Sequence, residues 1–567
     1  MIKYDLSIIL TGYSGEGIQY IGHHFCYILY KKKINFKTFI EIPSEINSPI
    51  KEKENISNFI IRFSNKKIIS YYNKAFLLLT TNYNSLKKNI NNIKKKAIII
   101  LYFDNYNKNL LKNDKKLLFK IKKKKIIYIN SLKYIKNKFL IKKKISLSKK
   151  KFIKNTLILG FLFYYFNLFD KKLSYKFFFK KKNKNIALLN YKILKLSLKI
   201  AKKKIKNKIK IKSNYKKKRN IINGNYSIVI GLLYFSIKSK LGLFYSSYPI
   251  TPSTTINDYF KKIKKNFNII INDSEDEISA ICSSIGASLS GKKLGIVATS
   301  GPGMSLIQES LGLAVVLEVP LIIINVQRAG PSTGLPTKIE QSDLMQSIYG
   351  RHGEAPIPII AINNIKNVYK IIILSCKLSI KFKTPIIILS DSFISNNLIL
   401  FKFKKYKIKV LKFKKLINKT IGGLSDINKH QKKIKKRQKK INLIKKKIKK
   451  TLQYIFYGKK SGSLLIIGWG STYEIIKETV KILLKKYKIG YIHFILIYPL
   501  NYNILDKIYK NYNKILIIEL NNKQFIYIIK SFCKKLKKIY SYNQINGEPL
   551  KIKKLIYYIK KLLKISK

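Results

Sequence analysis

The chain of 567 residues carries 117 Lys and Arg residues against 26 Asp and Glu residues, a formal net charge of +91, and 46% of it is hydrophobic. At roughly 100–200 residues per domain, this length predicts three or four domains, and the hydrophobic content excludes a fully disordered protein. Only five basic residues are arginine, the residue that nucleic-acid readers favour for bidentate contacts. We therefore interpret the lysine excess as genome-wide mutational drift, with a polyanion-binding surface as the alternative.

Four cysteines lie far apart without a CxxC pair: Cys26, Cys282, Cys376 and Cys533. This spacing argues against a disulfide framework, and it predicts no metal ligands and no iron–sulfur cluster held by this chain alone. The N-terminus lacks the layout of a signal peptide, and the longest apolar stretch, residues 156–169, is too short for a membrane span. We expect a soluble cytoplasmic protein that binds neither nucleic acid nor membrane.

Residues 1–205 are the first predicted α/β domain. A strand over Asp5–Leu10 is followed by three glycines in the segment Gly12–Gly17 and then by a helix. The GxxGxG spacing differs from the GxGxxG dinucleotide fingerprint, and the next candidate acid, Glu41, lies some 24 residues beyond the last glycine. A tight strand-to-helix turn needs glycine in any case. We therefore favour a structural turn over a nucleotide site.

A charged linker at residues 206–225 leads to residues 226–400, where helices alternate with short apolar strands. The predicted helices are Ser227–Leu241, Asp276–Ser290 and Ser305–Leu317, and the strands are Phe267–Ile271, Leu294–Ala298, Leu321–Val326 and Pro385–Asp391. This alternation predicts a parallel sheet covered on both faces.

The rest of the chain is a Lys-rich helical connector at 401–458, with a helix expected over His430–Gln453, and a last α/β domain at 459–567. Strands are expected there over Ser463–Ile467, Gly490–Ile497 and Lys514–Glu519. The predicted fold class is therefore α/β, with three α/β domains.

The window 270–360 departs from the composition of the chain. It holds nine acidic and five basic residues, a net charge of −4 in a chain of +91, together with ten of the 26 glycines. A segment that resisted drift toward lysine was held by function, so we place the chemistry of the protein here.

Four polar motifs lie in or beside this window. The segment YPITPST (Tyr248–Thr254) follows an apolar run and precedes a helix, TSGPG (Thr299–Gly303) joins a predicted strand to a helix, and SEDEISA (Ser274–Ala280) opens a helix. Acids in a first helical turn also suit the helix dipole, which is the structural alternative for Glu277. Arg328 directly follows a predicted strand, at the sheet edge where open α/β folds bind ligands.

The segments YPITPST, SEDEISA, ATSGPGMSL, NVQRAGPSTGLPT, EQSDLMQSIYGRHGEAP and IIGWGSTYEIIK together resemble the alpha subunit of the 2-oxoacid:ferredoxin oxidoreductases. The resemblance is closest to the 2-oxoglutarate type, in which a gamma-like domain is fused ahead of alpha. It implies a gamma-like domain at 1–205, a pyrimidine-binding thiamine diphosphate module at 226–400 and a transketolase C-terminal-like domain at 459–567.

The resemblance implies oxidative decarboxylation of a 2-oxoacid with coenzyme A and ferredoxin, most closely 2-oxoglutarate to succinyl-CoA. Pyruvate or a branched 2-oxoacid is the alternative substrate, and a Lys-rich nucleic-acid-binding protein is the remote alternative. The chain has neither a GDG motif for a magnesium diphosphate nor a cysteine cluster. We therefore expect thiamine diphosphate to be shared with a beta subunit that carries Mg²⁺ and the iron–sulfur cluster.

The resemblance also assigns roles to single residues. Glu277 matches the glutamate that hydrogen-bonds the aminopyrimidine ring and promotes the imino form that deprotonates the thiazolium carbon. Thr251 and Arg328 match positions that hold the 2-oxocarboxylate. Three more residues are expected to contact the cofactor: Pro249, Ser300 and Gly301.

Arg351 and His352, between two glycines, are expected to bind the substrate, with Arg351 on the distal carboxylate of a dicarboxylic acid. For Arg351 two alternatives stay open: an ion pair with Glu354 that stiffens the loop, and a contact to coenzyme A.

Overall fold

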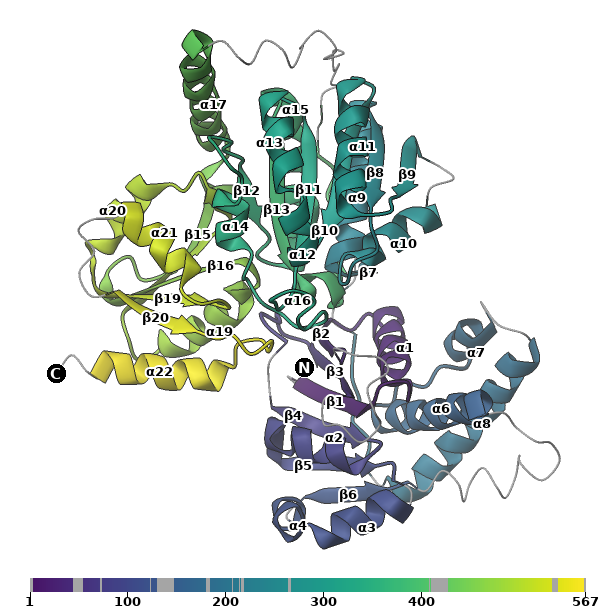
Figure 1. Cartoon of the computed structure of the whole chain (residues 1–567). Helices are drawn as coiled ribbons and strands as arrows, with labels where there is room; N and C mark the ends of the chain where they lie inside the picture. Colours follow the sequence, from purple (N-terminus) through teal and green to yellow (C-terminus); the bar gives the residue numbers. More distant parts are fainter. Residues whose placement is uncertain are drawn as a thin grey trace. The chain divides into compact units, whose positions relative to one another are not determined.

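A computed structural model of the chain (Figure 1) describes residues 4–43, 55–71, 74–103, 105–122, 124–129, 147–179, 184–205, 207–213, 215, 219–263, 267–406, 408, 427–532 and 539–564. The chain splits into two compact units. One contains Met1–Ile221 and Asn397–Lys402, and the other contains Ile222–Asn396 and Phe403–Lys567.

The first unit is built on a sheet with the strand order β6-β5-β4-β1-β3-β2-β14-β7. Strands β1, β4, β5 and β6 are parallel, while β3 runs antiparallel to both β1 and β2. The strands are β1 (Asp5–Tyr13), β2 (Phe36–Glu41), β3 (Ile56–Ser64), β4 (Ala75–Thr80), β5 (Ile93–Leu101), β6 (Lys125–Tyr128), β7 (Asn220–Ile222) and β14 (Ile399–Phe401).

Aromatic side chains fill the core of this unit, where Phe25 packs against Phe63 and Phe163. The helices are α1 (Ile18–Lys31), α2 (Tyr83–Asn89), α3 (Asn105–Asn113), α4 (Lys115–Lys122), α6 (Leu147–Tyr165), α7 (Lys171–Phe179) and α8 (Lys184–Lys204).

The second unit holds two sheets, and the middle sheet of the chain has the order β18-β12-β13-β11-β10-β8-β9. All its strands are parallel except β18. They are β8 (Gly242–Ser247), β9 (Ile269–Asp273), β10 (Lys293–Thr299), β11 (Leu321–Gln327), β12 (Ile359–Ala361), β13 (Pro385–Asp391) and β18 (Leu496–Tyr498). Strands β11 and β13 are buried along their whole length, which explains their isoleucine runs.

The helices around the middle sheet are α9 (Gly224–Ser239), α10 (Thr254–Ile263), α11 (Glu277–Leu289), α12 (Gly301–Leu306), α13 (Gln308–Val316), α14 (Leu344–Tyr349), α15 (Ile365–Phe382) and α16 (Ser392–Asn396). One hydrophobic cluster joins α11 and α13 to the strands and continues into the third sheet through Trp469 and Phe525.

The third sheet has the order β15-β17-β16-β19-β20. Its strands are β15 (Tyr454–Gly458), β16 (Gly462–Trp469), β17 (Ile489–Phe494), β19 (Tyr512–Glu519) and β20 (Ile539–Asn543). The accompanying helices are α17 (Ile427–Lys447), α18 (Lys450–Gln453), α19 (Tyr473–Leu483), α20 (Tyr502–Tyr509), α21 (Gln524–Phe532) and α22 (Ile552–Lys564).

Several elements differ from the sequence prediction. The expected helix His430–Gln453 is two helices, α17 and α18. The expected helix Ser305–Leu317 is two helices, α12 and α13, and α12 begins earlier because glycine and proline are tolerated in a first turn. The expected strand Gly490–Ile497 divides into β17 and β18, so the chain passes from the third sheet into the middle sheet. The segment Asn397–Lys402, expected within or just after the middle domain, belongs to the first unit because β14 pairs with β2.

In the ranges that the structure describes, no helix combines the length and apolar character that crossing a membrane requires.

Candidate active site

The candidate active site lies at the carboxyl edge of the middle sheet. Strands β8, β10 and β11 are parallel neighbours, so the loops that follow them leave the sheet on the same side. These loops begin at Tyr248, Ser300 and Arg328. The fold therefore brings three polar motifs together at this edge, which is where open parallel sheets bind ligands.

Glu277 is the first residue of α11, and its side chain is buried. The preceding residue, Asp276, caps the helix by accepting a hydrogen bond from the Ser279 amide at 2.6 Å. Only 6% of Glu277 is exposed, and a Cβ atom on Gly303 would lie 2.6 Å from its carboxylate. Glycine is therefore what lets α12 approach this group. Burial raises the pKa of Glu277, and the nearby Asp276 carboxylate adds to the rise.

Arg328 is a buried cation beside Thr251. Its side chain is 7% exposed, and Nη1 donates a hydrogen bond to the Thr251 carbonyl oxygen at 2.8 Å. The Nε atom is buried and has no hydrogen-bond partner among the described residues. Burial lowers the pKa of the guanidinium, while the charges of Asp343 and Glu277 oppose this effect. The side chain of Thr251 itself is exposed.

Ser300 and Gly301 form the turn into α12. Ser300 occupies the N-cap position, but its Oγ makes no capping bond and is buried without a partner in the described part of the chain. A buried hydroxyl without a partner is costly, so this atom is suited to a polar ligand group. A Cβ atom on Gly301 would lie 2.9 Å from the Asp343 carboxylate. Pro249 is exposed on the loop after β8.

Asp343 is a site residue that the sequence analysis missed. It is 7% exposed, and its carboxylate accepts hydrogen bonds from Asn325 Nδ2 at 3.0 Å and Ser342 Oγ at 3.4 Å. Burial raises its pKa to about 6, against the opposing effects of these two hydrogen bonds and of Arg328. Its place among the acids of the window 270–360 was the available signal.

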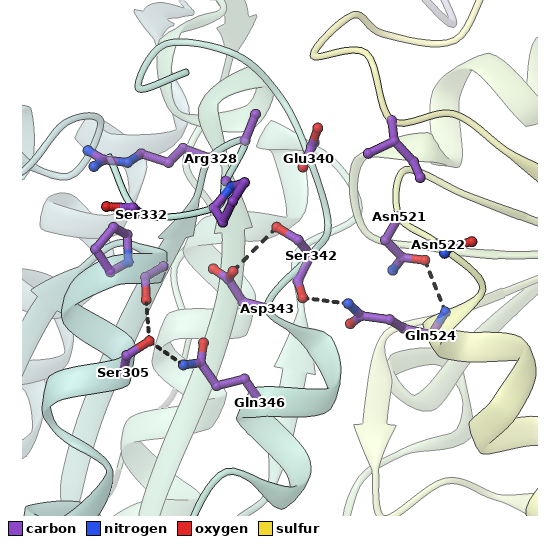
Figure 2. A pocket seen from close by; sticks show the side chains of 16 residues that line it. Ser305, Arg328, Ser332, Glu340, Ser342, Asp343, Gln346, Asn521, Asn522 and Gln524 are labelled. Carbon is purple, nitrogen blue, oxygen red and sulfur yellow. Dashed lines mark hydrogen bonds between the residues drawn. The ribbon is translucent and has the colours of Figure 1, made fainter. Parts of the chain in front are cut away.

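A cavity of about 610 Å³ opens at this edge, a volume in the usual range for small-molecule sites (Figure 2). Its charged walls are Arg328, Asp343 and Glu340, and burial raises the pKa of Glu340. The remaining lining residues are Gly301, Pro302, Ser305, Ala329, Gly330, Pro331, Ser332, Ser342, Gln346, Asn521, Asn522, Gln524 and Ile545. The middle and third sheets therefore both contribute to the cavity.

Gln341 bonds the segment before α14 to the third sheet. Its Nε2 donates to the Trp469 carbonyl at 2.9 Å, and its Oε1 accepts from the Leu520 amide at 2.9 Å. Asn521 Nδ2 donates to the main-chain oxygen of Gln341 at 2.8 Å. One glutamine thus fixes this segment by both its side chain and its backbone.

Gln524 holds the same segment at Ser342 and Met345. Its Nε2 donates to the Ser342 carbonyl at 2.7 Å, and its Oε1 accepts from the Met345 amide at 3.1 Å. Because Asp343 lies between these two bonded residues, its backbone position depends on the third sheet (Figure 2).

Arg351 is bonded to its own neighbourhood rather than directed at the cavity. Its Nε donates to the Ala355 carbonyl at 2.9 Å, and Nη1 and Nη2 donate to the Ser347 and Ile348 carbonyls at 2.9 and 2.6 Å. It is 8% exposed, and burial lowers its pKa to about 10. His352 is exposed. Neither residue lines the cavity.

These contacts bear on the hypotheses for Arg351. Its donors close the carboxyl-terminal turn of α14, where helix carbonyls lack intrahelical partners. They favour a structural role over the distal-carboxylate role, but the partners are carbonyl oxygens and not the expected Glu354, which is exposed.

The glycine turn of the first unit is filled by its own glutamate. Glu16 Oε2 accepts hydrogen bonds from the Tyr13 amide at 2.7 Å, Thr81 Oγ1 at 2.5 Å and Asn82 Nδ2 at 3.3 Å. Gly17 has a φ of +81°, which favours glycine. A carboxylate that fills the turn repels phosphate, so the geometry favours the structural turn.

Among the described residues, no group of three or more His, Cys, Asp or Glu side chains is arranged to hold a metal ion. Cys26 and Cys376 are buried and Cys282 is exposed, all as free thiols. Cys533 lies outside the described residues.

Two family profiles match the chain. Residues 238–422 match "Pyruvate flavodoxin/ferredoxin oxidoreductase, thiamine diP-bdg", and residues 7–206 match "Pyruvate ferredoxin/flavodoxin oxidoreductase". Together with the α/β fold, these matches define a subunit of the thiamine-dependent 2-oxoacid oxidoreductase class.

Curated relatives narrow the class. The chain is 30% identical over 329 residues to the 2-oxoglutarate synthase subunit KorA of Archaeoglobus fulgidus, covering 55% of this chain and 91% of that protein. It is 43% identical over 175 residues to the 2-oxoglutarate oxidoreductase subunit KorA of Mycobacterium tuberculosis, covering 31% of this chain but only 26% of that protein. The chain belongs to the KorA-type alpha-subunit family of the 2-oxoacid:ferredoxin oxidoreductases.

A solved structure shows the same fold. It is the 2-oxoglutarate:ferredoxin oxidoreductase from Magnetococcus marinus with 2-oxoglutarate, coenzyme A and succinyl-CoA bound, with a TM-score of 0.83 and 24% identity, covering 99% of this chain and 100% of that one. The predicted α/β fold class is confirmed.

Proposed function

We propose that this chain is the alpha subunit of an enzyme that converts 2-oxoglutarate, coenzyme A and oxidised ferredoxin into succinyl-CoA, carbon dioxide and reduced ferredoxin. The observation that carries this proposal is the meeting of Glu277, Arg328 and Thr251 at one sheet edge. Glu277 supplies a buried carboxyl group and Arg328 a buried cation, and of the three residues Arg328 lines the cavity of about 610 Å³. The names of the relatives, 2-oxoglutarate oxidoreductase and 2-oxoglutarate synthase subunits, support 2-oxoglutarate as the substrate.

The residues around Glu277 fit the aminopyrimidine ring of thiamine diphosphate. The raised pKa of the Glu277 carboxyl favours a proton that it can donate to a ring nitrogen. Gly303 leaves room beside this carboxyl, and the unpartnered Ser300 Oγ offers a polar contact. Gly301 and Pro249 would border the same ring. When bound, the cofactor supplies the electron sink that decarboxylation of a 2-oxoacid requires.

Arg328 fits the 2-oxocarboxylate of the substrate. One guanidinium nitrogen is bonded to Thr251, which leaves the unpartnered Nε and the remaining donors for an anion. A guanidinium binds a carboxylate through two parallel hydrogen bonds. Because Arg328 is buried, an anionic ligand also compensates a charge that is otherwise costly to bury.

A beta subunit completes this proposal. It would carry the diphosphate half-site with Mg²⁺ and the iron–sulfur cluster that passes electrons to ferredoxin. The sequence has no GDG motif, and the three described cysteines are scattered over the fold. We place the assembly in the cytoplasm, without nucleic acid or membrane as partners.

Co-expression with a partner that has a GDG motif and clustered cysteines tests the proposal. The assembled complex should reduce ferredoxin with 2-oxoglutarate and coenzyme A, while the chain alone should bind thiamine diphosphate weakly and show no iron–sulfur absorbance. An iron–sulfur cluster in the isolated chain would overturn the division of the site between subunits.

Comparison of 2-oxoacids decides the substrate. We expect a higher kcat/KM with 2-oxoglutarate than with pyruvate or a branched 2-oxoacid, and the reverse order would move the chain to the alternative substrate class. Nucleic acid that stays bound through purification in high salt would instead support the polyanion-binding alternative, because phosphate-driven binding falls steeply with salt.

A further inference from the structure

The charged side chains that line the cavity differ in which groups bind or neutralise their charges. Arg328 is bonded to a neutral carbonyl, and among the described residues no carboxylate forms a direct ion pair with it. Asp343 influences it through space across the same cavity (Figure 2). The positive field that an anionic substrate meets at Arg328 therefore depends on the charge of Asp343.

Hydrogen bonds fix the position of the Asp343 carboxylate, so its electrostatic effect on Arg328 stays constant. Asn325 and Ser342 donate to its carboxylate, and its amide donates to Gln327 Oε1 at 3.3 Å. The absence of a side chain at Gly301 keeps α12 close to it. A carboxylate bonded in this way cannot swing to form an ion pair with Arg328 without losing these bonds.

We propose that Asp343 is a positioning residue for substrate binding, whose carboxylate competes through space with the substrate anion for the field of Arg328 and so sets the affinity for the 2-oxoacid. The inference rests on the proposed function, because it takes the anion at Arg328 to be the substrate. The third sheet takes part through Gln341 and Gln524, which hold the segment that carries Asp343.

The competition between Asp343 and the substrate anion should change with pH in one direction. The pKa of Asp343 is raised to about 6, so its carboxyl is mostly ionised at pH 8 and half protonated near pH 6. Among the described residues, the charged groups that share its cavity are Arg328 and Glu340, Glu277 also acts on Arg328, and Lys523 on the neighbouring segment is exposed. Ionised Asp343 repels an incoming anion, so affinity should fall as the pH rises from about 6 to 8.

The variant Asp343→Asn removes the charge and keeps an acceptor for Asn325. Two unit charges in a partly buried site interact strongly enough to change a binding constant about 3- to 30-fold. In the assembled complex at pH 8 we expect KM for 2-oxoglutarate to fall by this factor, with kcat changed much less. An unchanged or higher KM, or a loss confined to kcat, would overturn the proposal.

The matched control is Glu340→Gln, which removes a buried carboxylate from the same loop and cavity. The charges of Asp343 and Glu277 raise the pKa of Arg328, whereas Glu340 is itself acted on by the charge of Asp343. This variant should keep most of the wild-type pH dependence of KM. If both variants change KM equally, the effect belongs to the cavity as a whole and the assignment to Asp343 fails.

A direct binding measurement tests this inference separately from the proposed function. The probe is 2-hydroxyglutarate, whose carbonyl is already reduced and whose carboxyl groups are ionised above about pH 6. Calorimetry on the complex should show affinity falling between pH 6 and 8 in the wild type and a flat profile in Asp343→Asn. If Arg328→Gln leaves binding intact, the anion is elsewhere and the inference is wrong, whereas the proposed function fails on the turnover assay.

Discussion

Two glycine turns that follow parallel strands, one after β1 and one after β10, look alike in sequence but differ in what surrounds them. In both places a glycine lets the backbone pass close to a glutamate: Gly12 of β1 lies beside Glu16, and Gly303 of α12 lies beside Glu277. Glu16 accepts three hydrogen bonds from its own neighbourhood. Glu277 is buried with a raised pKa and accepts no side-chain hydrogen bond from a described residue. The unpartnered Ser300 Oγ in the described part of the chain, and not the glycines, distinguishes the turn that we propose to be functional.

The two arginines of the window 270–360 repeat this contrast. Arg351 gives its donors to three carbonyl oxygens, whereas Arg328 keeps an unpartnered Nε at the sheet edge. Both are buried to nearly the same extent, at 8% and 7% exposure. Burial therefore does not separate the two arginines, but the state of their hydrogen-bond donors does, and this difference supports the proposed roles.

The largest expected effect comes from Glu277→Gln. An amide cannot exchange a proton with the aminopyrimidine, and loss of such acid–base help typically costs about 10²–10⁴ in rate. Turnover and exchange of the thiazolium proton should both fall in this range while the complex still assembles. The matched control is Glu275→Gln, an exposed neighbour that should stay near wild type. Wild-type proton exchange in Glu277→Gln would refute the assignment.

Next in size is Arg351→Met, which leaves three carbonyl oxygens without their donor. We expect the free energy of unfolding to fall by about 2–4 kcal/mol in denaturant titration, with equal losses on 2-oxoglutarate and 2-oxobutyrate. Arg437→Met on the lysine-rich helix α17 is the control and should change stability by less than about 0.5 kcal/mol. A selective loss on 2-oxoglutarate of roughly 10- to 150-fold would restore the distal-carboxylate role.

Arg328→Gln should act on binding more than on stability. Loss of a charge-assisted carboxylate contact is worth about 1.5–3 kcal/mol, so KM for the 2-oxoacid should rise roughly 10- to 150-fold while KM for coenzyme A stays constant. Arg328→Lys keeps the charge but not the planar guanidinium group, so its KM for the 2-oxoacid should lie between those of the wild type and of Arg328→Gln. A loss of stability with an unchanged KM would show that Arg328 has a structural role, as we expect for Arg351.

The smallest effect is expected from Glu16→Ala. Its three lost hydrogen bonds should lower the free energy of unfolding of the first unit by about 1–2 kcal/mol, because the donors of Tyr13, Thr81 and Asn82 then need water. Kinetic constants should not change. A raised KM for coenzyme A at unchanged stability would instead show that this turn binds a nucleotide-containing ligand.

The sequence by itself determined the α/β class and the family, and it predicted the position of the chemistry. Short isoleucine runs between helices are a local pattern that a sheet covered on both faces requires, as β11 and β13 show. The acidic window and the motif around Glu277 are likewise contiguous in the chain. The sequence predicts such features because the residues that cause each of them lie close together in the chain.

Only the tertiary structure decided which of these residues act together. Arg328 and Asp343 lie at opposite ends of the connection between β11 and α14, and Gln341 bonds to Leu520 across about half the second unit's sequence. The passage of the chain from β17 into β18 and the return of Asn397–Lys402 to the first unit depend on long-range strand pairing. Hydrogen-bond satisfaction, which separates Arg328 from Arg351 and Glu277 from Glu16, depends on partners that no local pattern specifies.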